Sequence, residues 1–241
     1  MKFDSIKTEL NSNGFATCQG FYSEEEVRDI LSLIESSNLF KSIKQSSQQV
    51  YAIRRFLKEM PSLKTLLFND KLKALLNDLF DHTYFNTKAI YFDKPEVSNW
   101  FVSYHQDISI MVDRKEEVEG YSKWTKKGTD YGVHPPLEIL NNIVTVRIHL
   151  DDTTIDNGAL KVISGSHKMG VYPSAENNYE KERVCDVERG GIMLMKPLIM
   201  HASERTRNKK QRRVIHLEFS DKNLKSPLNW SEKLNVSSTG T

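Results

Sequence analysis

Three short segments of the chain hold a histidine followed two residues later by an acid. They are His105-Gln106-Asp107, His149-Leu150-Asp151 and His216-Leu217-Glu218. In a β-strand, residues two apart point to the same face, so each imidazole would lie beside a carboxylate. Such a pair, joined by a second histidine from elsewhere, forms the 2-His-1-carboxylate triad that typically binds non-haem Fe(II) with open coordination positions. Each pair also fits a solvated strand face or a structural hydrogen bond.

The first pair is the favoured metal site. Residues 100–107 alternate apolar and polar side chains, and we expect a strand over residues 99–111 that runs into a long loop. Functional residues often lie at such rims, on loops carried by a rigid scaffold. By contrast, Asp151 leads into a turn, where it would cap or face solvent. The third pair belongs to a closing strand beside a basic run.

The second histidine ligand is expected to be His201, which the mostly apolar residues 195–200 would carry inside. A lone histidine there is more often a core residue, but Arg212 changes the balance, because a guanidinium pairs bidentately with a carboxylate. An enzyme with a dicarboxylate cosubstrate needs such a residue for the far carboxylate. Arg212 and Arg213 adjoin the last strand, and one of them must point inward. A basic surface hairpin is expected to hold Arg205, Arg207, Lys209 and Lys210.

Length and composition limit the class of protein. The 241 residues suit one domain spanning 1–241. Lys and Arg number 34 against 32 Asp and Glu, so the net charge of +2 indicates neither a nucleic-acid nor a membrane partner. Cys18 and Cys185 make no disulfide framework or zinc cluster and suit a reducing compartment. With no signal-peptide core and no membrane-spanning run, a cytoplasmic location is expected.

Helices come first along the chain, and strands follow. Ser23 to Glu26 match a capping box, and the apolar residues after it follow the period of one helix face. More helix is expected from Pro61, with two apolar stripes separated by Asn69-Asp70. Strands are expected over residues 88–92, 142–150, 159–163, 192–195 and 214–219. This order predicts a mainly β fold, a double-stranded β-helix (jelly-roll or cupin-like barrel) over about 84–220 with flanking α-helices over about 20–80.

Residues 112–137 are charged and rich in glycine and proline, and they are expected to form a long loop. Loops of this length within a compact domain often serve as lids or binding loops. Trp124 and Tyr131 favour an ordered lid over a disordered insert, because aromatic residues are scarce in disordered segments. The expected substrate contacts are therefore Trp124, Tyr131 and, beside Arg147 on a predicted strand, His149.

Together these motifs resemble the phytanoyl-CoA dioxygenase family of Fe(II)- and 2-oxoglutarate-dependent oxygenases, and within it a bacterial branch of unassigned substrate. The resemblance runs over most of the chain and rests on the combination, since no single motif is specific. The matching stretches are Gly14-Phe15, Phe21 to Glu26, His105-Gln106-Asp107, Leu150-Asp151-Asp152, Asp156 to Leu160, Ser164 to Lys168, Pro197 to Ser203 and Arg212-Arg213.

The resemblance implies a role for each site residue. The implied iron ligands are His105, Asp107 and His201. Arg212 would pair with the C5 carboxylate of 2-oxoglutarate, and Ser203 would hydrogen-bond the same molecule. Arg147 stands where a characterised relative has a tryptophan that contacts the cosubstrate. As a cation, Arg147 would hold a carboxylate of 2-oxoglutarate or an acidic group of the substrate.

The expected function is that of an Fe(II)- and 2-oxoglutarate-dependent dioxygenase. It would use O2 to hydroxylate an unidentified small molecule, with succinate and CO2 as coproducts and ascorbate as a supporting reductant. Related halogenases replace the acid of the triad with a small residue, so Asp107 argues against halogenation. Two alternatives stay open: a non-catalytic protein that binds metal or 2-oxoglutarate on the same fold, and a zinc-dependent hydrolase. A monomer or homodimer is expected.

Overall fold

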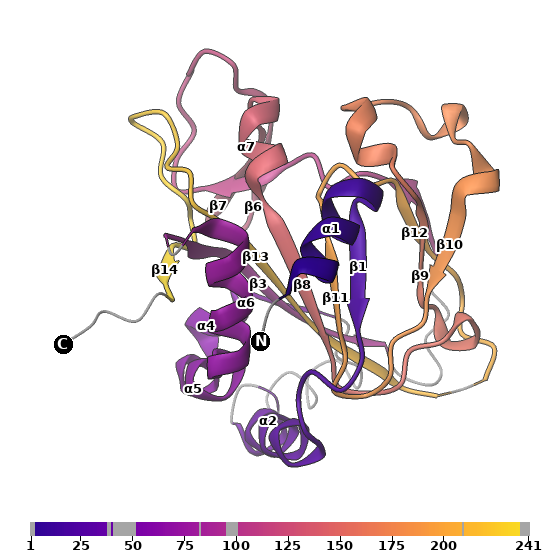
Figure 1. The fold of residues 1–241 in the computed structure, drawn as a ribbon. Helices are drawn as coiled ribbons and strands as arrows, with labels where there is room; N and C mark the ends of the chain where they lie inside the picture. The colour runs from indigo at the N-terminus through magenta and orange to yellow at the C-terminus, as the bar shows by residue number, and fades with distance from the viewer. Residues whose placement is uncertain are drawn as a thin grey trace.

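The computed structural model describes residues 3–37, 40, 52–81, 83–94, 101–208 and 210–236 (Figure 1). Two antiparallel sheets form its centre, and a smaller third sheet lies beside them. The large sheet has the order β1-β11-β8-β13-β3-β14, with β2 also paired to β3. Its strands are β1 (Phe15–Cys18), β2 (Ala52–Arg54), β3 (Phe85–Lys94), β8 (Val144–His149), β11 (Ile192–Met195), β13 (Arg212–Ser220) and β14 (Leu234–Asn235).

The second sheet has the order β10-β9-β12-β4 and the third has the order β5-β7-β6. The strands of these two sheets are β4 (Val102–His105), β5 (Ile110–Val112), β6 (Ser122–Lys127), β7 (Asp130–His134), β9 (Leu160–Ile163), β10 (Glu182–Cys185) and β12 (His201–Ser203). The two larger sheets, all antiparallel and flanked by helices, confirm the double-stranded β-helix predicted from the sequence.

Helices cover the outer face of the large sheet, away from β9 and β12 (Figure 1). The longer ones are amphipathic and bury one apolar stripe each. The helices are α1 (Asp4–Asn13), α2 (Glu24–Ser36), α4 (Phe56–Glu59), α5 (Lys64–Leu67), α6 (Asp70–Phe80) and α7 (Leu137–Asn142). Short 3-10 turns are η1 (Pro61–Leu63), η2 (Ile155–Asn157), η3 (Ser166–Met169), η4 (Ser174–Glu176) and η5 (Tyr179–Lys181).

The predicted capping box at the start of α2 is present. The Ser23 hydroxyl accepts a bond from the Glu26 amide at 3.2 Å, and the Glu26 carboxylate accepts one from the Ser23 amide at 2.8 Å. The other oxygen of Glu26 accepts from the Asn69 side chain at 2.6 Å, and Asn69 is itself the N-cap of α6. The two helix starts are therefore joined, and the Ser23–Glu26 and Asn69 predictions are confirmed.

Alternation along the central strands gives the large sheet two different faces. Val146 and Ile148 of β8 and Leu217 of β13 pack against the helices. Arg147 and His216, which alternate with them, point the other way, toward the second sheet. The cavity discussed below therefore lies between the two sheets, on the face away from the helices.

Two predictions about this region are wrong. The strand expected over 99–111 is two strands, β4 and β5, because the Asp107 amide leaves the strand pairing and bonds the Pro197 carbonyl at 2.9 Å. Residues 99 and 100 lie outside the described part of the chain. The loop expected over 112–137 instead holds the β6–β7 hairpin, which turns at Gly128 with a φ of 65°, and α7 begins at its end. Glycine at the first position of a two-residue turn is typical of hairpins.

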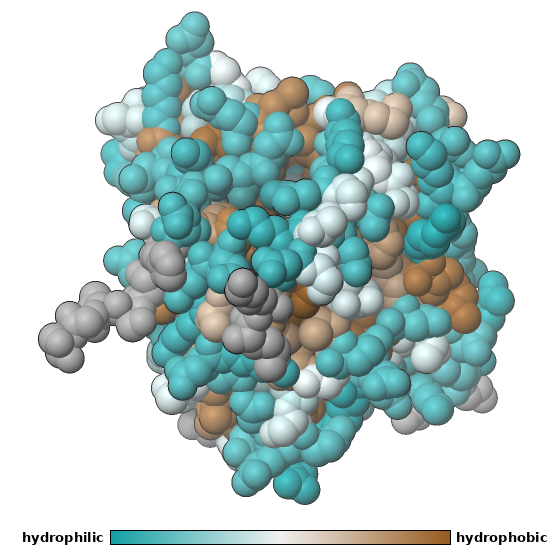
Figure 2. Space-filling model, in the orientation of Figure 1, coloured by the Kyte–Doolittle hydropathy of each residue, from teal (hydrophilic) through white to brown (hydrophobic). Residues whose placement is uncertain are grey.

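The surface shown in Figure 2 is mostly hydrophilic, with hydrophobic residues in small groups. Scattered apolar residues of this kind are normal on a folded protein and need no partner to explain them. Among the helices that the structure describes, none combines the length and the apolar character needed to cross a lipid bilayer.

The linked caps make a testable contribution to stability. Replacing Ser23 with alanine removes the acceptor for the Glu26 amide, so we expect Ser23→Ala to lower the free energy of unfolding by about 1 kcal/mol. Ser32→Ala, on the exposed face of the same helix, is the matched control and should change stability by less than about 0.5 kcal/mol. Urea denaturation followed by circular dichroism measures both, and equal effects would contradict the capping role.

Candidate functional site

Three side chains from two regions of the chain converge at the end of the second sheet. His105 and His201 are directly opposed partners on β4 and β12, with ring centroids 4.2 Å apart. Asp107 follows β4 and places its carboxylate oxygens 4.0 Å from His105 Nε2 and 3.8 Å from His201 Nε2. Ligand atoms of all three lie within 4.8 Å of one another. Side-chain exposure falls from 41% at His105 to 7% at His201, so the group spans from the rim of the cavity to its interior.

Gln106, the middle residue of the triplet, holds this geometry in place. Its side-chain amide donates to the carbonyls of Gly170 and Leu198, both at 2.7 Å, and its carbonyl accepts from the Tyr172 amide at 3.1 Å. The pattern of the sequence singled out its two neighbours and not Gln106. A buried amide with all these bonds made fixes the backbone between the two candidate ligands.

Each histidine is oriented by the backbone carbonyl two residues before it. His105 Nδ1 lies 2.9 Å from the Ser103 carbonyl, and His201 Nδ1 lies 2.9 Å from the Ile199 carbonyl. A carbonyl only accepts, so both Nδ1 atoms donate, and each Nε2 presents a lone pair toward Asp107 when the ring is neutral. Backbone contacts of this kind usually fix the tautomer of metal-binding histidines.

The charges of the triad suit a divalent metal. Burial raises the pKa of Asp107, but attraction by His201, Lys88, His216 and His105 outweighs it and lowers that pKa to about 2. Burial lowers the pKa of His201 to about 4 despite the nearby carboxylate. Near neutral pH the site therefore offers one carboxylate and a neutral imidazole at its buried end, which are the forms that bind a metal.

The distances are also compatible with one ion. Two metal–ligand bonds of about 2.1 Å span at most about 4.2 Å, and about 3 Å at the right angle of a facial site. The two His–Asp separations of 4.0 Å and 3.8 Å lie within reach of one ion, around which the side chains would close by about 1 Å. Two nitrogens and one carboxylate, with the remaining side open to a cavity of about 380 Å³, fit the facial arrangement of a non-haem Fe(II) centre.

Two buried guanidinium groups, Arg212 and Arg147, line the same cavity. Their exposed fractions are 5% and 8%, and the Nε of each has no hydrogen-bond partner in the described part of the chain. Burial and, to a lesser extent, the charge of Arg147 lower the pKa of Arg212 to about 9. Burial lowers the pKa of Arg147 to about 10. Buried charges are normally paired, so this end of the cavity lacks an anion.

Gly158 and Ser203 complete the pocket around Arg212. The Gly158 carbonyl accepts from Arg212 Nη1 and, at 2.9 Å, from the Ser203 hydroxyl. Gly158 has a φ of 85°, and a Cβ there would lie 2.7 Å from the Glu204 carbonyl oxygen and 2.9 Å from Lys94 Nζ. The turn recognised in the sequence at Asp156-Asn157-Gly158 therefore needs glycine both for its conformation and for the close approach.

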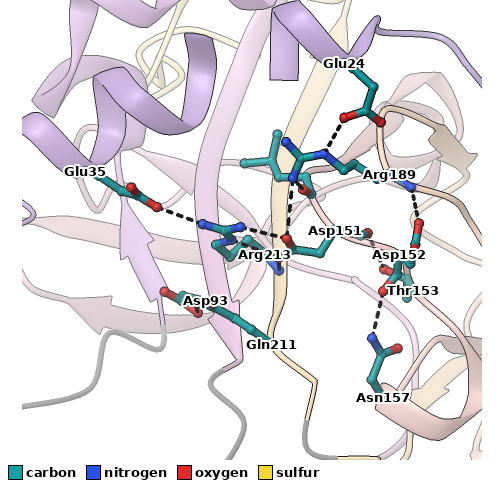
Figure 3. Close-up of polar contacts among 11 residues, drawn as sticks. Glu24, Glu35, Asp93, Asp151, Asp152, Thr153, Asn157, Arg189, Gln211 and Arg213 are labelled. Atoms are coloured by element: carbon teal, nitrogen blue, oxygen red, sulfur yellow. Dashed lines mark hydrogen bonds and ion pairs between the residues drawn. The ribbon is translucent and has the colours of Figure 1, made fainter. Parts of the chain in front are cut away.

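The structure separates the roles of Arg212 and Arg213, which the sequence left open. Arg213 is not among the residues that line the cavity, and its side chain points toward Asp151 and Glu35 (Figure 3). It donates to both carboxylate oxygens of Asp151, at 2.8 Å and 2.7 Å, and to Glu35 at 2.9 Å. The sequence had suggested that Asp151 caps a turn or faces solvent. Instead, Asp151 pairs with Arg213.

The third His-x-acid pair lies in the cavity wall, where the sequence analysis did not place it. Arg147 Nη1 lies 3.2 Å from His216 Nδ1, His216 Nε2 lies 3.1 Å from Glu218 Oε1, and Lys88 Nζ lies 2.6 Å from that same oxygen. An arginine only donates, so His216 accepts through Nδ1 and donates through Nε2 to Glu218. This chain of bonds holds Arg147 toward the cavity. The sequence did hold a signal for this pair: the alternation of β13 puts His216 and Glu218 on the same face as Arg212.

The expected substrate residues do not meet in this cavity. Trp124 and Tyr131 lie on β6 and β7 of the third sheet, and their partly buried side chains pack against the apolar cluster around Ile110 and Val133. His149 points to the inner face but is not part of the cavity lining. Its Nδ1 is 2.7 Å from the Thr153 hydroxyl, and its buried Nε2 has no partner among the residues that the structure describes. None of the three lines the cavity that contains the triad.

Comparisons with known proteins agree with this arrangement. A family model described as phytanoyl-CoA dioxygenase matches residues 10–214. The chain belongs to the phytanoyl-CoA dioxygenase family. Membership makes this protein an oxygenase, and it confirms the family resemblance seen in the motifs. No curated protein matches the chain in sequence.

Several solved structures share the fold of this chain at low sequence identity. HygX from Streptomyces hygroscopicus, solved with nickel and 2-oxoglutarate bound, is 14% identical with a TM-score of 0.66, covering 91% of this chain and 87% of that one. EctD from S. alaskensis, in its apoform, is 16% identical with a TM-score of 0.70, covering 94% and 80%. AviO1 from Streptomyces viridochromogenes Tue57 is 17% identical with a TM-score of 0.63, covering 91% and 95%.

Burial of neutral histidines makes stability depend on pH. The pKa of His201 falls from its ordinary value of 6.5 to about 4, and burial also lowers the pKa of His149 and His216. The unfolded chain then binds more protons than the folded one between these pH values, so stability falls as the pH falls from 6.5 toward 4. We expect His201 alone to account for about 2 kcal/mol between pH 7 and pH 5.

Urea unfolding of the metal-free protein at pH 7, 6 and 5 measures this dependence. His201→Gln removes one titrating imidazole and should make the pH dependence shallower, whereas Arg28→Gln, on the exposed face of α2, should leave it unchanged. If stability stays constant over this range, or rises toward pH 5, the conclusion that these histidines are buried in their neutral form is contradicted.

Proposed function

We propose that this protein is an Fe(II)- and 2-oxoglutarate-dependent oxygenase that hydroxylates a small molecule and releases succinate and CO2. The observation that supports this best is the pairing, in one cavity, of a candidate metal triad with buried guanidinium groups that lack an anion. 2-Oxoglutarate has the matching shape, since it carries a keto acid at one end and a carboxylate at the other. HygX, which shares the fold, was solved with nickel and 2-oxoglutarate bound.

In this proposal the metal ligands are His105, Asp107 and His201. When bound, iron and 2-oxoglutarate supply, with O2, the oxidising power for hydroxylation of a C–H bond. The histidines contribute neutral Nε2 atoms already oriented by backbone carbonyls, and Asp107 contributes the single negative charge. The direction and tautomer of both rings are therefore set before the metal binds, and binding needs only a closure of the three side chains around the ion.

Arg212 holds the far carboxylate of the cosubstrate, and Ser203 joins it when its hydroxyl turns from the Gly158 carbonyl to donate to that carboxylate. The Nε of Arg212 is free to donate, while its Nη1 is fixed on the Gly158 carbonyl. Arg147 lies along the same inner face, held by His216, and its pKa responds to Asp107. Because its charge acts on both Asp107 and Arg212, Arg147 steadies the cosubstrate by charge. Together these groups orient the cosubstrate and replace the water that would otherwise solvate it.

The metal assignment predicts a loss of binding. Replacing Asp107 with alanine removes the only carboxylate of the triad and should lower Fe(II) or Mn(II) affinity by at least about tenfold. His105→Ala should behave alike, whereas His167→Ala, a half-buried histidine bonded to the Asn11 carbonyl away from the triad, should bind metal as wild type does. Anaerobic titration calorimetry with Mn(II) measures this, and wild-type affinity in Asp107→Ala would refute the site.

The cosubstrate assignment predicts opposite behaviour of two adjacent arginines. Arg212→Gln should weaken 2-oxoglutarate binding to the metal-loaded protein by about 30-fold or more, because a buried charged contact is lost. Arg213→Gln is the matched control. It should lower thermal stability, since Asp151 loses its partner, yet leave 2-oxoglutarate affinity within about threefold of wild type.

Turnover provides a further test of the same assignment. The protein incubated with Fe(II), 2-oxoglutarate, O2 and ascorbate should release succinate, and Arg212→Gln should release far less at the same 2-oxoglutarate concentration. Binding of 2-oxoglutarate without succinate release or O2 consumption would instead identify a non-catalytic binding protein.

A further inference from the structure

A second cavity continues the one that contains the triad. Its volume is about 470 Å³, and it shares four wall residues with the first: Arg54, Lys88, Ile90 and Met111. Its far side is the tip of the β6–β7 hairpin, at Gly128, Thr129 and Asp130. A molecule held near the triad therefore has room to extend across this shared wall toward the hairpin.

The first cavity carries more positive than negative charge. Its lining includes the cations Arg54, Lys88, Arg147 and Arg212 against the carboxylates Asp107 and Glu218, an excess of two positive charges. The second cavity adds Arg55 against Asp130 and Glu232, so the joined cavities keep an excess of one positive charge. On the proposed function, on which this inference rests, Fe(II) adds two positive charges and 2-oxoglutarate adds two negative ones. The excess therefore remains when both are bound, and it must be met by water, by small ions or by the substrate.

Two of these cations, Lys88 and Arg54, lie in the wall that the cavities share, and they differ in their ion pairs. Lys88 is paired with Glu218 at 2.6 Å, and Arg147 and Arg212 lie on the inner face of the large sheet beyond it. Arg54, at the end of the edge strand β2, has no hydrogen bond or ion pair with any residue that the structure describes. It stands opposite Ile90 in the register of β2 and β3 and lines both cavities.

The next residue shows that this freedom is specific to Arg54. Arg55 takes a left-handed conformation, with a φ of 56°, which is unusual for a residue other than glycine. The turn directs its guanidinium to the hairpin, where it donates to the Thr129 hydroxyl at 2.9 Å and lies 3.6 Å from Asp130. Adjacent arginines thus differ: Arg55 fastens the hairpin to β2, and Arg54 is left facing the cavities.

We propose that the substrate carries an anionic group, a carboxylate or a phosphate, that pairs with Arg54 at the junction of the two cavities. The body of the substrate then lies against Ile90 and Met111, the apolar residues of the shared wall. Arg54 thereby selects for charge at one end of the substrate, while the triad acts at the other. A guanidinium suits this role because it pairs bidentately with either kind of oxyanion.

Matched pairs of small probes test this directly. The protein is loaded with Mn(II) and saturating 2-oxoglutarate, so that the triad and Arg212 are occupied. Titration calorimetry then compares hexanoate with hexanamide, 3-phenylpropanoate with 3-phenylpropanamide, and hexyl phosphate with hexanol. We expect the charged member of at least one pair to bind about tenfold more tightly, as for one charge-assisted contact. The carboxylate and phosphate pairs show which anion is preferred.

Variants assign that preference to one residue. Arg54→Gln should bring the charged and neutral probes to within about twofold of each other, and Arg54→Lys should keep most of the preference. Arg28→Gln, an exposed arginine on α2, should behave as wild type. Because Arg54 lies on an exposed edge, its variants should keep the wild-type melting temperature.

Three results would overturn the proposal: equal binding of charged and neutral probes, no binding of any charged probe, or an unchanged preference in Arg54→Gln. Failure of the proposed function looks different. In that case the wild-type protein does not bind 2-oxoglutarate at all, which the loading titration shows before any probe is added, and the charge preference at Arg54 is still read from the same probe titrations.

Discussion

The two-residue period of β3, β8 and β13 governs the chemistry of this protein. A strand sends successive side chains to opposite faces, so a shift of pairing by one residue would exchange the faces completely. In the observed register, Arg147 stands opposite His216, and Glu218 stands opposite Lys88 on one side and Thr145 on the other. The residues between them form the core under the helices. One set of strand pairings therefore fixes both the stability of the sheet and the polarity of the cavity.

That arrangement places charges where water is scarce. A buried charge without a partner costs several kcal/mol, and within the described ranges of the chain Arg147 and Arg212 each keep an Nε without a partner. Binding of a dicarboxylate would remove this cost, which explains why the fold tolerates two guanidinium groups that repel each other. A hydrolase that needed only a metal and a water molecule would give these groups no purpose. The electrostatics of the cavity thus favour an anionic cosubstrate independently of the metal ligands.

Local patterns in the sequence were enough to predict the cap of α2, the central strands and the overall fold class. They were also enough to single out His105, Asp107 and His201, which the structure brings together. The expected placement of His105 and Asp107 on one face of a single strand is not observed. Asp107 is not a strand neighbour of His105; it follows the end of β4 and is held by the Pro197 carbonyl. That contact joins residues ninety positions apart and has no local signal. The same holds for Gln106, whose partners are Gly170, Leu198 and Tyr172.

The segment 112–137 shows the opposite difficulty. Its lysines and glycines hide the alternation of a short hairpin, since Trp124, Tyr131 and Val133 are too few to show a hydrophobic period. Trp124 and Tyr131 looked like binding residues because they were the aromatic exceptions, yet they lie on the strands of the third sheet and pack on its apolar cluster. Whether Arg212 or Arg213 faced inward also depended on register, which only the pairing of β13 with β3 and β8 decides.

Anomalous X-ray scattering at the iron edge, from crystals grown without oxygen in the presence of Fe(II) and 2-oxoglutarate, tests the central claim most directly. We predict one iron peak within bonding distance of His105 Nε2, His201 Nε2 and the Asp107 carboxylate. Density for 2-oxoglutarate should run from that peak to the guanidinium of Arg212. Iron bound elsewhere, or a cosubstrate whose far carboxylate lies away from Arg212, would contradict the account.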